Sequence, residues 1–247
     1  MLRFFRLVFS PSMPYSYHRQ SAGNLLEETV RHIIIWALPL IVAVVFHEVA
    51  HGWVANRLGD PTAARLGRLT LNPIAHIDLF GSILVPLMLI IAHSPFVFGY
   101  AKPVPVNFNN LRNPKRDMIW VAIAGPATNL LLALLFAGAW RLLAGFFDVD
   151  GGKSATGTAQ FLAPLILMAQ GGILINIALA VFNALPLPPL DGGRVMVGLL
   201  PQPLSGTLAR VEPFGFIILI ALLMTRTLDS LIDPPMEFLL RLYLGLL

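Results

Sequence analysis

The sequence predicts an all-α, polytopic integral membrane helix bundle with a small extended or β element and a re-entrant segment. Hydrophobic residues make up 56% of the 247 positions and charged residues only 12%, whereas soluble domains average about one quarter charged. Several apolar runs approach or reach the length needed to cross a hydrocarbon layer about 30 Å thick, and loops rich in Gly, Pro, Asn and Arg separate them. We expect an amino-terminal tail over residues 1–31 and a single transmembrane domain over residues 32–247.

The charge distribution fits a membrane protein better than a nucleic-acid-binding protein. The 17 Lys and Arg outnumber the 13 Asp and Glu, which gives a formal net charge of +4. The basic residues are spread thinly between apolar runs and form no stripe, so we expect the lipid bilayer and no nucleic acid as a partner. The chain has no cysteine, which leaves nitrogen and oxygen atoms as possible ligands of a metal ion.

The first apolar run is HIIIWALPLIVAVVFHEVAHGW over residues 32–53, and it predicts a helix that crosses the membrane. The next run, residues 77–92, is short and is interrupted by Pro86, which favours a re-entrant segment or a pair of short half-segments over a full crossing. Neither RLGRLTL over residues 65–71 nor KPVPVNF over residues 102–108 has a helical pattern, and both are expected to be extended.

Later apolar runs predict the rest of the bundle. Residues 118–143 and 161–184 are long enough for two further crossings. Residues 214–224 form a short run. The final run, residues 231–247, is more typical of an interfacial helix, because it carries four residues that disfavour a full crossing: Pro234, Pro235, Glu237 and Arg241.

The motif HEVAH at the end of the first run predicts a metal site. His47 and His51 are four residues apart and therefore share one face of a helix, with Glu48 beside them. A zinc ion can take both imidazoles while the carboxylate meets a water molecule. Ionisable side chains inside an apolar crossing are costly and mark functional sites by default, which argues against two histidines that are merely satisfied within a bundle.

A catalytic zinc ion held by two histidines needs a third protein ligand. The segment FNALPLPPLDGGR offers Asp191 shortly after three prolines that end the fourth apolar run. Non-helical backbone at membrane depth is tolerated where it lines a cavity enclosed by protein. Taken alone, the same pattern equally suits a proline-rich interfacial turn with a solvated aspartate.

Together the motifs resemble the site-2 protease family of intramembrane zinc metalloproteases. HEVAH matches the HExxH of that family, and NALPLPPLDG over residues 183–192 matches its NxxPxxxxDG pattern. AGPATN over residues 124–129 resembles the family's small-residue segment on the intervening helix. RLGRLTLNPIAHID and FGYAKPVPVNFNNLRNP resemble a compact prokaryotic branch that lacks a PDZ module.

The resemblance implies one zinc ion (Zn2+) per chain, with His47, His51 and Asp191 as its ligands. Glu48 would be the catalytic acid and base, and Asn183 a contact to the substrate. The implied activity is hydrolysis of peptide bonds within or near transmembrane segments of membrane-protein substrates, in a prokaryotic inner membrane. The oligomeric state is left open.

Two other functions remain possible for such a chain. A metal-binding membrane transporter would be expected to repeat polar residues on several helices, often with internal symmetry, and neither is visible in the sequence. An inactive membrane scaffold has no need for Glu48. The complete HExxH and LDG motifs therefore favour proteolysis.

Three more polar residues invite alternatives. His76 and Asp78 would suit partners that orient the metal ligands, or a structural cap at the start of the next apolar run. Asn129 lies inside an apolar run and is expected to bond between helices, where Gly125 and Ala127 allow a close approach.

The motifs also constrain topology and substrate binding. Both ligand-bearing helices carry their ligands at or just past their carboxyl ends, so they must point the same way, with an odd number of crossings between them. This requirement favours a re-entrant path for residues 77–92. Because cleavage needs an extended backbone, either residues 65–71 or residues 102–108 are expected to offer a strand edge to the substrate. Residues 65–71 are the better candidate, because Pro103 and Pro105 remove donors from the other stretch. The alternative is a hairpin that only shapes the fold.

Overall fold

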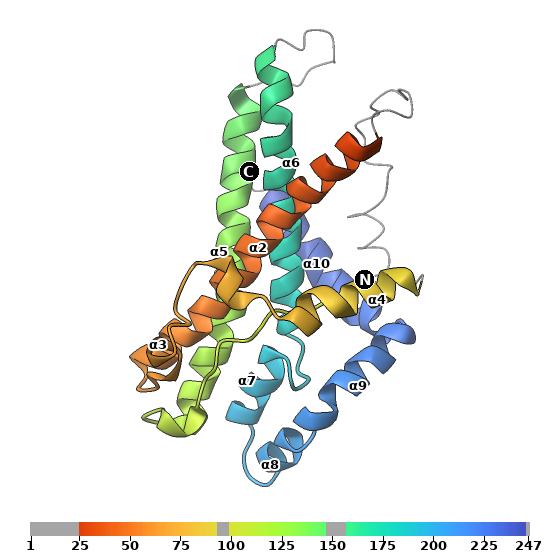
Figure 1. Cartoon of the computed structure of the whole chain (residues 1–247). Coiled ribbons are helices and arrows are strands. Elements are labelled where there is room, and N and C mark those ends of the chain that lie inside the picture. The colour runs from red at the N-terminus through yellow and green to blue at the C-terminus, as the bar shows by residue number, and fades with distance from the viewer. Residues whose placement is uncertain (1–24, 93–98, 147–156, 246–247) are drawn as a thin grey trace.

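The computed structural model describes residues 25–92, 99–146 and 157–245. Its frame consists of three long helices: α2 (Leu25–Arg57), α5 (Pro114–Phe146) and α6 (Gly157–Asn183). Each contains a stretch long and apolar enough to cross a membrane. Figure 1 shows α2 and α6 running in one direction and α5 in the other. This agrees with the three predicted crossings and with ligand-bearing helices that point the same way.

Shorter elements fill the connections. Between α2 and α5 lie α3 (Thr62–Arg65), the 3-10 turn η2 (Pro73–His76), the π-helix η3 (Leu79–Leu84), α4 (Val85–Ile91) and the 3-10 turn η4 (Phe108–Asn110). After α6 come α7 (Asp191–Leu199), α8 (Leu204–Ala209), α9 (Glu212–Met224) and α10 (Thr227–Gly245). Of the predicted tail, residues 1–24 lie outside the described part of the chain, and α2 begins at Leu25.

The two ends of the apolar segment that follows η2 are joined by main-chain hydrogen bonds. The Tyr100 N–H donates to the Gly81 carbonyl (3.0 Å), and the Lys102 N–H donates to the His76 carbonyl (2.9 Å). Between these contacts, η3 and α4 form one short apolar helix over Leu79–Ile91, about 20 Å long at 1.5 Å per residue. That length is below the roughly 30 Å of a hydrocarbon layer, so both observations favour a re-entrant path.

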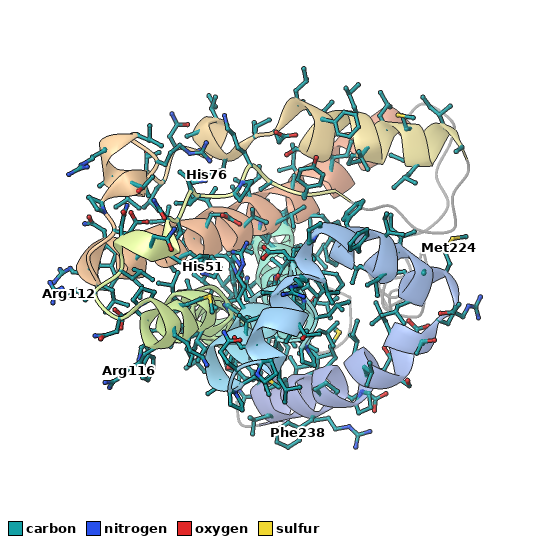
Figure 2. All side chains as sticks on the ribbon, turned by 90° about the horizontal axis from the view of Figure 1, so that it is seen from below. His51, His76, Arg112, Arg116, Met224 and Phe238 are labelled. Atoms are coloured by element: carbon teal, nitrogen blue, oxygen red, sulfur yellow. The ribbon has the colours of Figure 1, made fainter. Side chains whose placement is uncertain are left out.

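The C-terminal region is a bent helix pair rather than an isolated interfacial helix. The helices α9 and α10 meet at 83° and are together long and apolar enough for a broken span or a re-entrant loop. On α10, Leu228, Ile232 and Met236 are buried in the main core cluster, together with Ile173 and Ile177 of α6. Figure 2 shows Met224 and Phe238 at the outer rim, where their side chains are exposed. The final helix thus covers the bundle core with one face.

The described residues contain no strand, and the stretches expected to be extended lie mainly in irregular backbone. Gly67 turns the chain after α3 with a φ of +65°, a conformation that L side chains rarely adopt. Two irregular stretches, residues 68–72 and 99–107, follow α3 and α4. Arg68 joins them, because its guanidinium donates to the Lys102 carbonyl at 3.0 Å. Pro103 and Pro105 carry no N–H, which limits ladder formation there.

Candidate metal centre

The metal centre begins with the register between α2 and α5. His47 and His51 are one turn apart on α2, and Val121, Gly125 and Asn129 are one turn apart on α5. Because the two helices run antiparallel, His47 lies opposite Asn129 and His51 lies opposite Val121. The His47 Nδ1 is 2.6 Å from the Asn129 Oδ1, and the His51 Nδ1 is 2.6 Å from the Val121 carbonyl oxygen.

Gly125, the middle residue of that stripe, makes room for both imidazoles. A Cβ atom at this position would lie 2.3 Å from the His51 Nε2 and 2.5 Å from the His47 Cε1. A side chain here would force both rings to shift, so the glycine lets them keep the positions that their hydrogen bonds require. The small-residue motif AGPATN therefore has a direct role in the geometry of the site, beyond letting the helices approach.

Asp191 reaches the histidines from a helix that the sequence did not predict. The chain turns after Asn183, and Asp191 is the first residue of α7. Three glycines make α7 a poor helix on propensity alone. Two of them are required by packing, since a Cβ atom on Gly192 would lie 2.2 Å from the Ala184 carbonyl oxygen and one on Gly193 would lie 2.1 Å from the Pro188 nitrogen. The prolines thus fold back against the start of α7 and aim Asp191 at α2.

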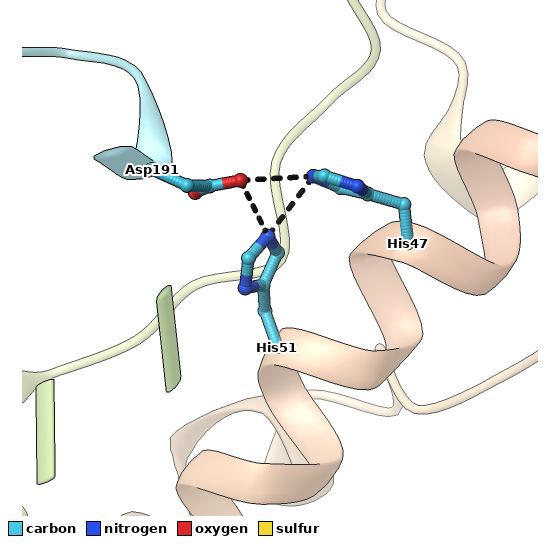
Figure 3. Close-up of side chains that lie close together, drawn as sticks. All are labelled: His47, His51 and Asp191. Carbon is cyan, nitrogen blue, oxygen red and sulfur yellow. Dashed lines mark hydrogen bonds and ion pairs between the residues drawn. The ribbon is translucent and has the colours of Figure 1, made fainter. Parts of the chain in front are cut away.

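Figure 3 shows the three side chains pointing toward one another. The His47 Nε2 and His51 Nε2 atoms are 3.0 Å apart, and the Asp191 Oδ2 lies 3.2 Å from the first and 3.3 Å from the second. All three residues are buried, with exposed fractions of 7–9%. Ligand atoms about 2.0–2.1 Å from a tetrahedral zinc ion are separated by about 3.3–3.4 Å. The observed triangle is close to that size.

The hydrogen bonds behind the rings fix which nitrogen carries the proton. The Val121 carbonyl can only accept, so the His51 Nδ1 donates to it. The Asn129 amide nitrogen is engaged by the Ala43 carbonyl (3.2 Å) and by the Asn176 Oδ1 (2.8 Å), so its oxygen faces His47 and accepts from Nδ1. Both neutral rings therefore present an Nε2 lone pair to the Asp191 carboxylate. Three acceptors that face one another in a buried space are stabilised by a cation, and a nitrogen and oxygen donor set suits zinc.

Glu48 is half-buried beside this triangle on α2. Its Oε2 accepts a hydrogen bond from the main-chain N–H of Val104 at 2.8 Å. The carboxylate is therefore held by the extended stretch that precedes η4. No motif in the sequence marks Val104, whose only signal is an extended pattern of alternating prolines.

The structure places the other candidate residues as follows. Asn183 is half-buried at the end of α6, where its amide donates to the Leu179 carbonyl of the same helix (3.0 Å). Asp78 caps η3 by accepting from the Gly81 N–H (2.7 Å), and the ring of buried His76 bonds the Thr70 carbonyl (2.8 Å). Asp78 is therefore a helix cap, as one of the two alternatives predicted. The residue that orients the candidate ligand His47 is Asn129.

Comparison with known proteins agrees with this geometry. Residues 141–225 match the model of peptidase family M50, a region that includes Asp191. YwhC of Bacillus subtilis is 39% identical over 207 residues, which cover 81% of this chain and 84% of YwhC. Rip2 of Mycobacterium tuberculosis is 32% identical over 77% of this chain and 66% of its own length. Both are described as candidate zinc metalloproteases. A zinc metalloprotease of Methanocaldococcus jannaschii, MJ0392, is 24% identical over 68% of this chain and 35% of its own length. No solved structure matches the chain.

Proposed function

This chain belongs to peptidase family M50, and we propose that it hydrolyses peptide bonds within or next to transmembrane segments of membrane-protein substrates. The family assignment makes it an intramembrane zinc metalloprotease, in agreement with the resemblance drawn from its motifs. Its long apolar helices make it a multi-pass membrane protein.

His47, His51 and Asp191 are proposed as the zinc ligands. The observation that carries this assignment is the convergence of three buried acceptor atoms. Apart from the two Nε2 atoms, the Asp191 Oδ2 has no hydrogen-bond partner among the described residues. When bound, zinc lowers the pKa of a water molecule to about 7 and polarises the peptide carbonyl. Asn129 and the Val121 carbonyl hold the two rings so that Nε2 faces inward.

Glu48 is proposed as the group that moves the proton. It is adjacent in sequence to His47 and lies outside the ligand triangle, so its carboxylate is available to accept a proton from the attacking water. The same carboxyl group then donates that proton to the departing amine. Such a positioned acid and base contributes on the order of 10²- to 10⁴-fold to a rate.

The substrate must present an extended backbone at this site. In an α-helix the peptide carbonyl is engaged and its faces are crowded, so a transmembrane substrate has to unwind locally before attack. Asn183 stands at the end of α6 with its amide bonded to the Leu179 carbonyl. We propose that it turns toward the substrate backbone, or toward the oxyanion that develops there. The pairing of substrate with residues 65–71 stays a hypothesis. Arg65 ends α3, and residues 68–71 are irregular backbone without a strand.

The decisive variant is Glu48→Gln, assayed with detergent-purified protein and a model transmembrane peptide that contains Gly or Pro near its centre. The variant should keep its zinc and lose at least about a hundredfold in cleavage rate, because it removes the proton carrier and no ligand. Cleavage within about tenfold of the parent would contradict the role of Glu48. A transporter would remain competent with this change, so the same variant separates the two functions.

A further inference from the structure

The face of α2 that carries Glu48 also carries Gly52, one turn further along the helix. A Cβ atom on Gly52 would lie 2.6 Å from the Val104 Cγ1 and 2.6 Å from the Leu69 Cδ2. The missing side chain thus lets the extended chain lie directly on α2. Val104 is buried there with an exposed fraction of 6%, and its N–H meets the Glu48 carboxylate.

Residues 102–107, hereafter the strap, have few main-chain N–H donors. In the sequence KPVPVN, Pro103 and Pro105 carry no N–H. Between them, only Val104 offers a main-chain donor, and this is the donor that Glu48 accepts. The flanking prolines also restrict the backbone to extended conformations, so the N–H is positioned before any substrate arrives.

Both ends of the strap are tied down. At one end the Lys102 N–H donates to the His76 carbonyl (2.9 Å). At the other, the Asn107 N–H donates to the Asp60 Oδ2 (2.7 Å), and the Asn110 amide donates to the Asp60 Oδ1 (2.9 Å). Burial opposes ionisation of Asp60, but these hydrogen bonds and those from Thr62 lower its pKa below the usual value. An ionised Asp60 therefore fixes the register that brings Val104 to Glu48.

We propose that the main-chain N–H of Val104 is a positioning group for the catalytic carboxylate, built into the strap for that purpose. A glutamate side chain has several rotamers, and a hydrogen bond to Oε2 selects one of them and leaves Oε1 to accept the proton from water. Preorganised groups of this kind raise the rate of a chemical step without changing how tightly the substrate binds. This role rests on the proposed function of Glu48.

The kinetic test compares two matched variants. Val104→Pro removes the donor, whereas Val106→Pro removes the N–H of the same residue type two positions away, for which the described chain supplies no acceptor. In both, the preceding residue is a proline, so the restriction that each change adds to the ψ angle of that residue is the same. Val104→Pro should lower kcat about 10- to 100-fold, within the contribution of a positioned acid and base, with KM and zinc content within about twofold of the parent.

Val106→Pro should leave kcat within about twofold. Equal kcat in the two variants, an increase in kcat for Val104→Pro, or an effect of that variant on KM alone would overturn the proposal. An effect confined to KM would assign the strap to substrate binding instead. If Val104→Pro does not fold, an ester at this position, made by incorporating the α-hydroxy analogue of valine, removes the same N–H and keeps the side chain.

A second readout does not depend on activity. Because the prolines have no amide hydrogen, Val104 and Val106 supply the only two exchangeable amides of residues 103–106. Glu48→Ala should speed hydrogen exchange of the Val104 amide by at least about tenfold, whereas Glu48→Gln should preserve its protection, since the side-chain amide oxygen still accepts. Unchanged exchange in Glu48→Ala would overturn the contact. If the wild-type protein cleaves no peptide, the proposed function fails, yet the exchange result still decides whether this amide belongs to Glu48.

Discussion

At the scale of single residues, the tautomer of each histidine is determined by the atom that its Nδ1 faces. The Val121 carbonyl can only accept, so the His51 Nδ1 must carry the proton. For His47, the position of the proton depends on which atom of the Asn129 amide faces the ring. That amide is fixed in turn by Asn176, whose own nitrogen donates to the Gly172 carbonyl at 2.8 Å. Asn129 and Asn176 are both fully buried, so each lost hydrogen bond leaves a desolvated polar atom without a partner.

The first prediction compares the two asparagines. Asn129→Leu should weaken zinc binding about 10- to 100-fold, the usual cost of losing the partner of a ligating histidine. Asn176→Leu should weaken it less, because Asn129 still meets His47 and remains tied to the Ala43 carbonyl. Competition with a chromophoric chelator measures both affinities. Equal losses would show that the effect comes from general disruption of the helix interface rather than from the orientation of His47.

At the scale of secondary-structure elements, one stripe of α5 determines where the α2 histidines lie. The prediction concerns Gly125→Ala, which places a methyl group within 2.3 Å of the His51 Nε2. The rings must move, so zinc occupancy should fall at least about tenfold. Gly138→Ala on the same helix is the control, because nothing lies within 4 Å of the added Cβ atom. The control should bind zinc normally and gain up to about 1 kcal/mol of helix stability.

Metal analysis and thermal unfolding of the two purified proteins decide this prediction. Normal zinc content in Gly125→Ala would mean that the imidazoles have more room than the structure gives them. Loss of zinc in Gly138→Ala as well would attribute the effect to α5 as a whole.

The long elements could be predicted from the sequence because a membrane crossing requires about twenty apolar residues in a row. HEVAH was equally predictable, since both imidazoles come from one helix. In contrast, α7 was not predictable from local propensity, because Gly192 and Gly193 disfavour a helix and are explained only by the close approach of Ala184 and Pro188. The contact of Val104 with Glu48 joins residues 56 positions apart, and no local pattern encodes such a distance.

At the scale of the whole molecule, the direction of the helices brings the ligands to one place. Both α2 and α6 run the same way, and α5 returns between them (Figure 1). The segment over Leu79–Ile91 must then begin and end on one side of the membrane. Arg112, which precedes α5, and Arg116, in the first turn of α5, would share that side. Figure 2 shows them near one another at the edge of the molecule. The positive-inside rule predicts that this side is cytoplasmic, although it disfavours the opposite placement that the arginines of the amino-terminal tail would then have.

This arrangement predicts the accessibility of two single cysteines introduced into the cysteine-free chain. Thr70→Cys and Asn109→Cys flank the short apolar helix on either side. Both should be labelled by an impermeant thiol reagent from the same face of sealed vesicles, because hydrogen bonds join the two flanks at His76 and Lys102. Labelling from opposite faces would show that Leu79–Ile91 crosses the membrane.

The central claim is that His47, His51 and Asp191 together hold one zinc ion. The most direct measurement is the metal content of purified wild-type protein beside that of Asp191→Ala, each checked for its fold by helical circular dichroism. The wild-type protein should contain about one zinc per chain, and the variant should remain helical but lose most of its zinc, since two histidines alone leave the ion short of a protein ligand. Full zinc retention in a folded Asp191→Ala protein would contradict the assignment.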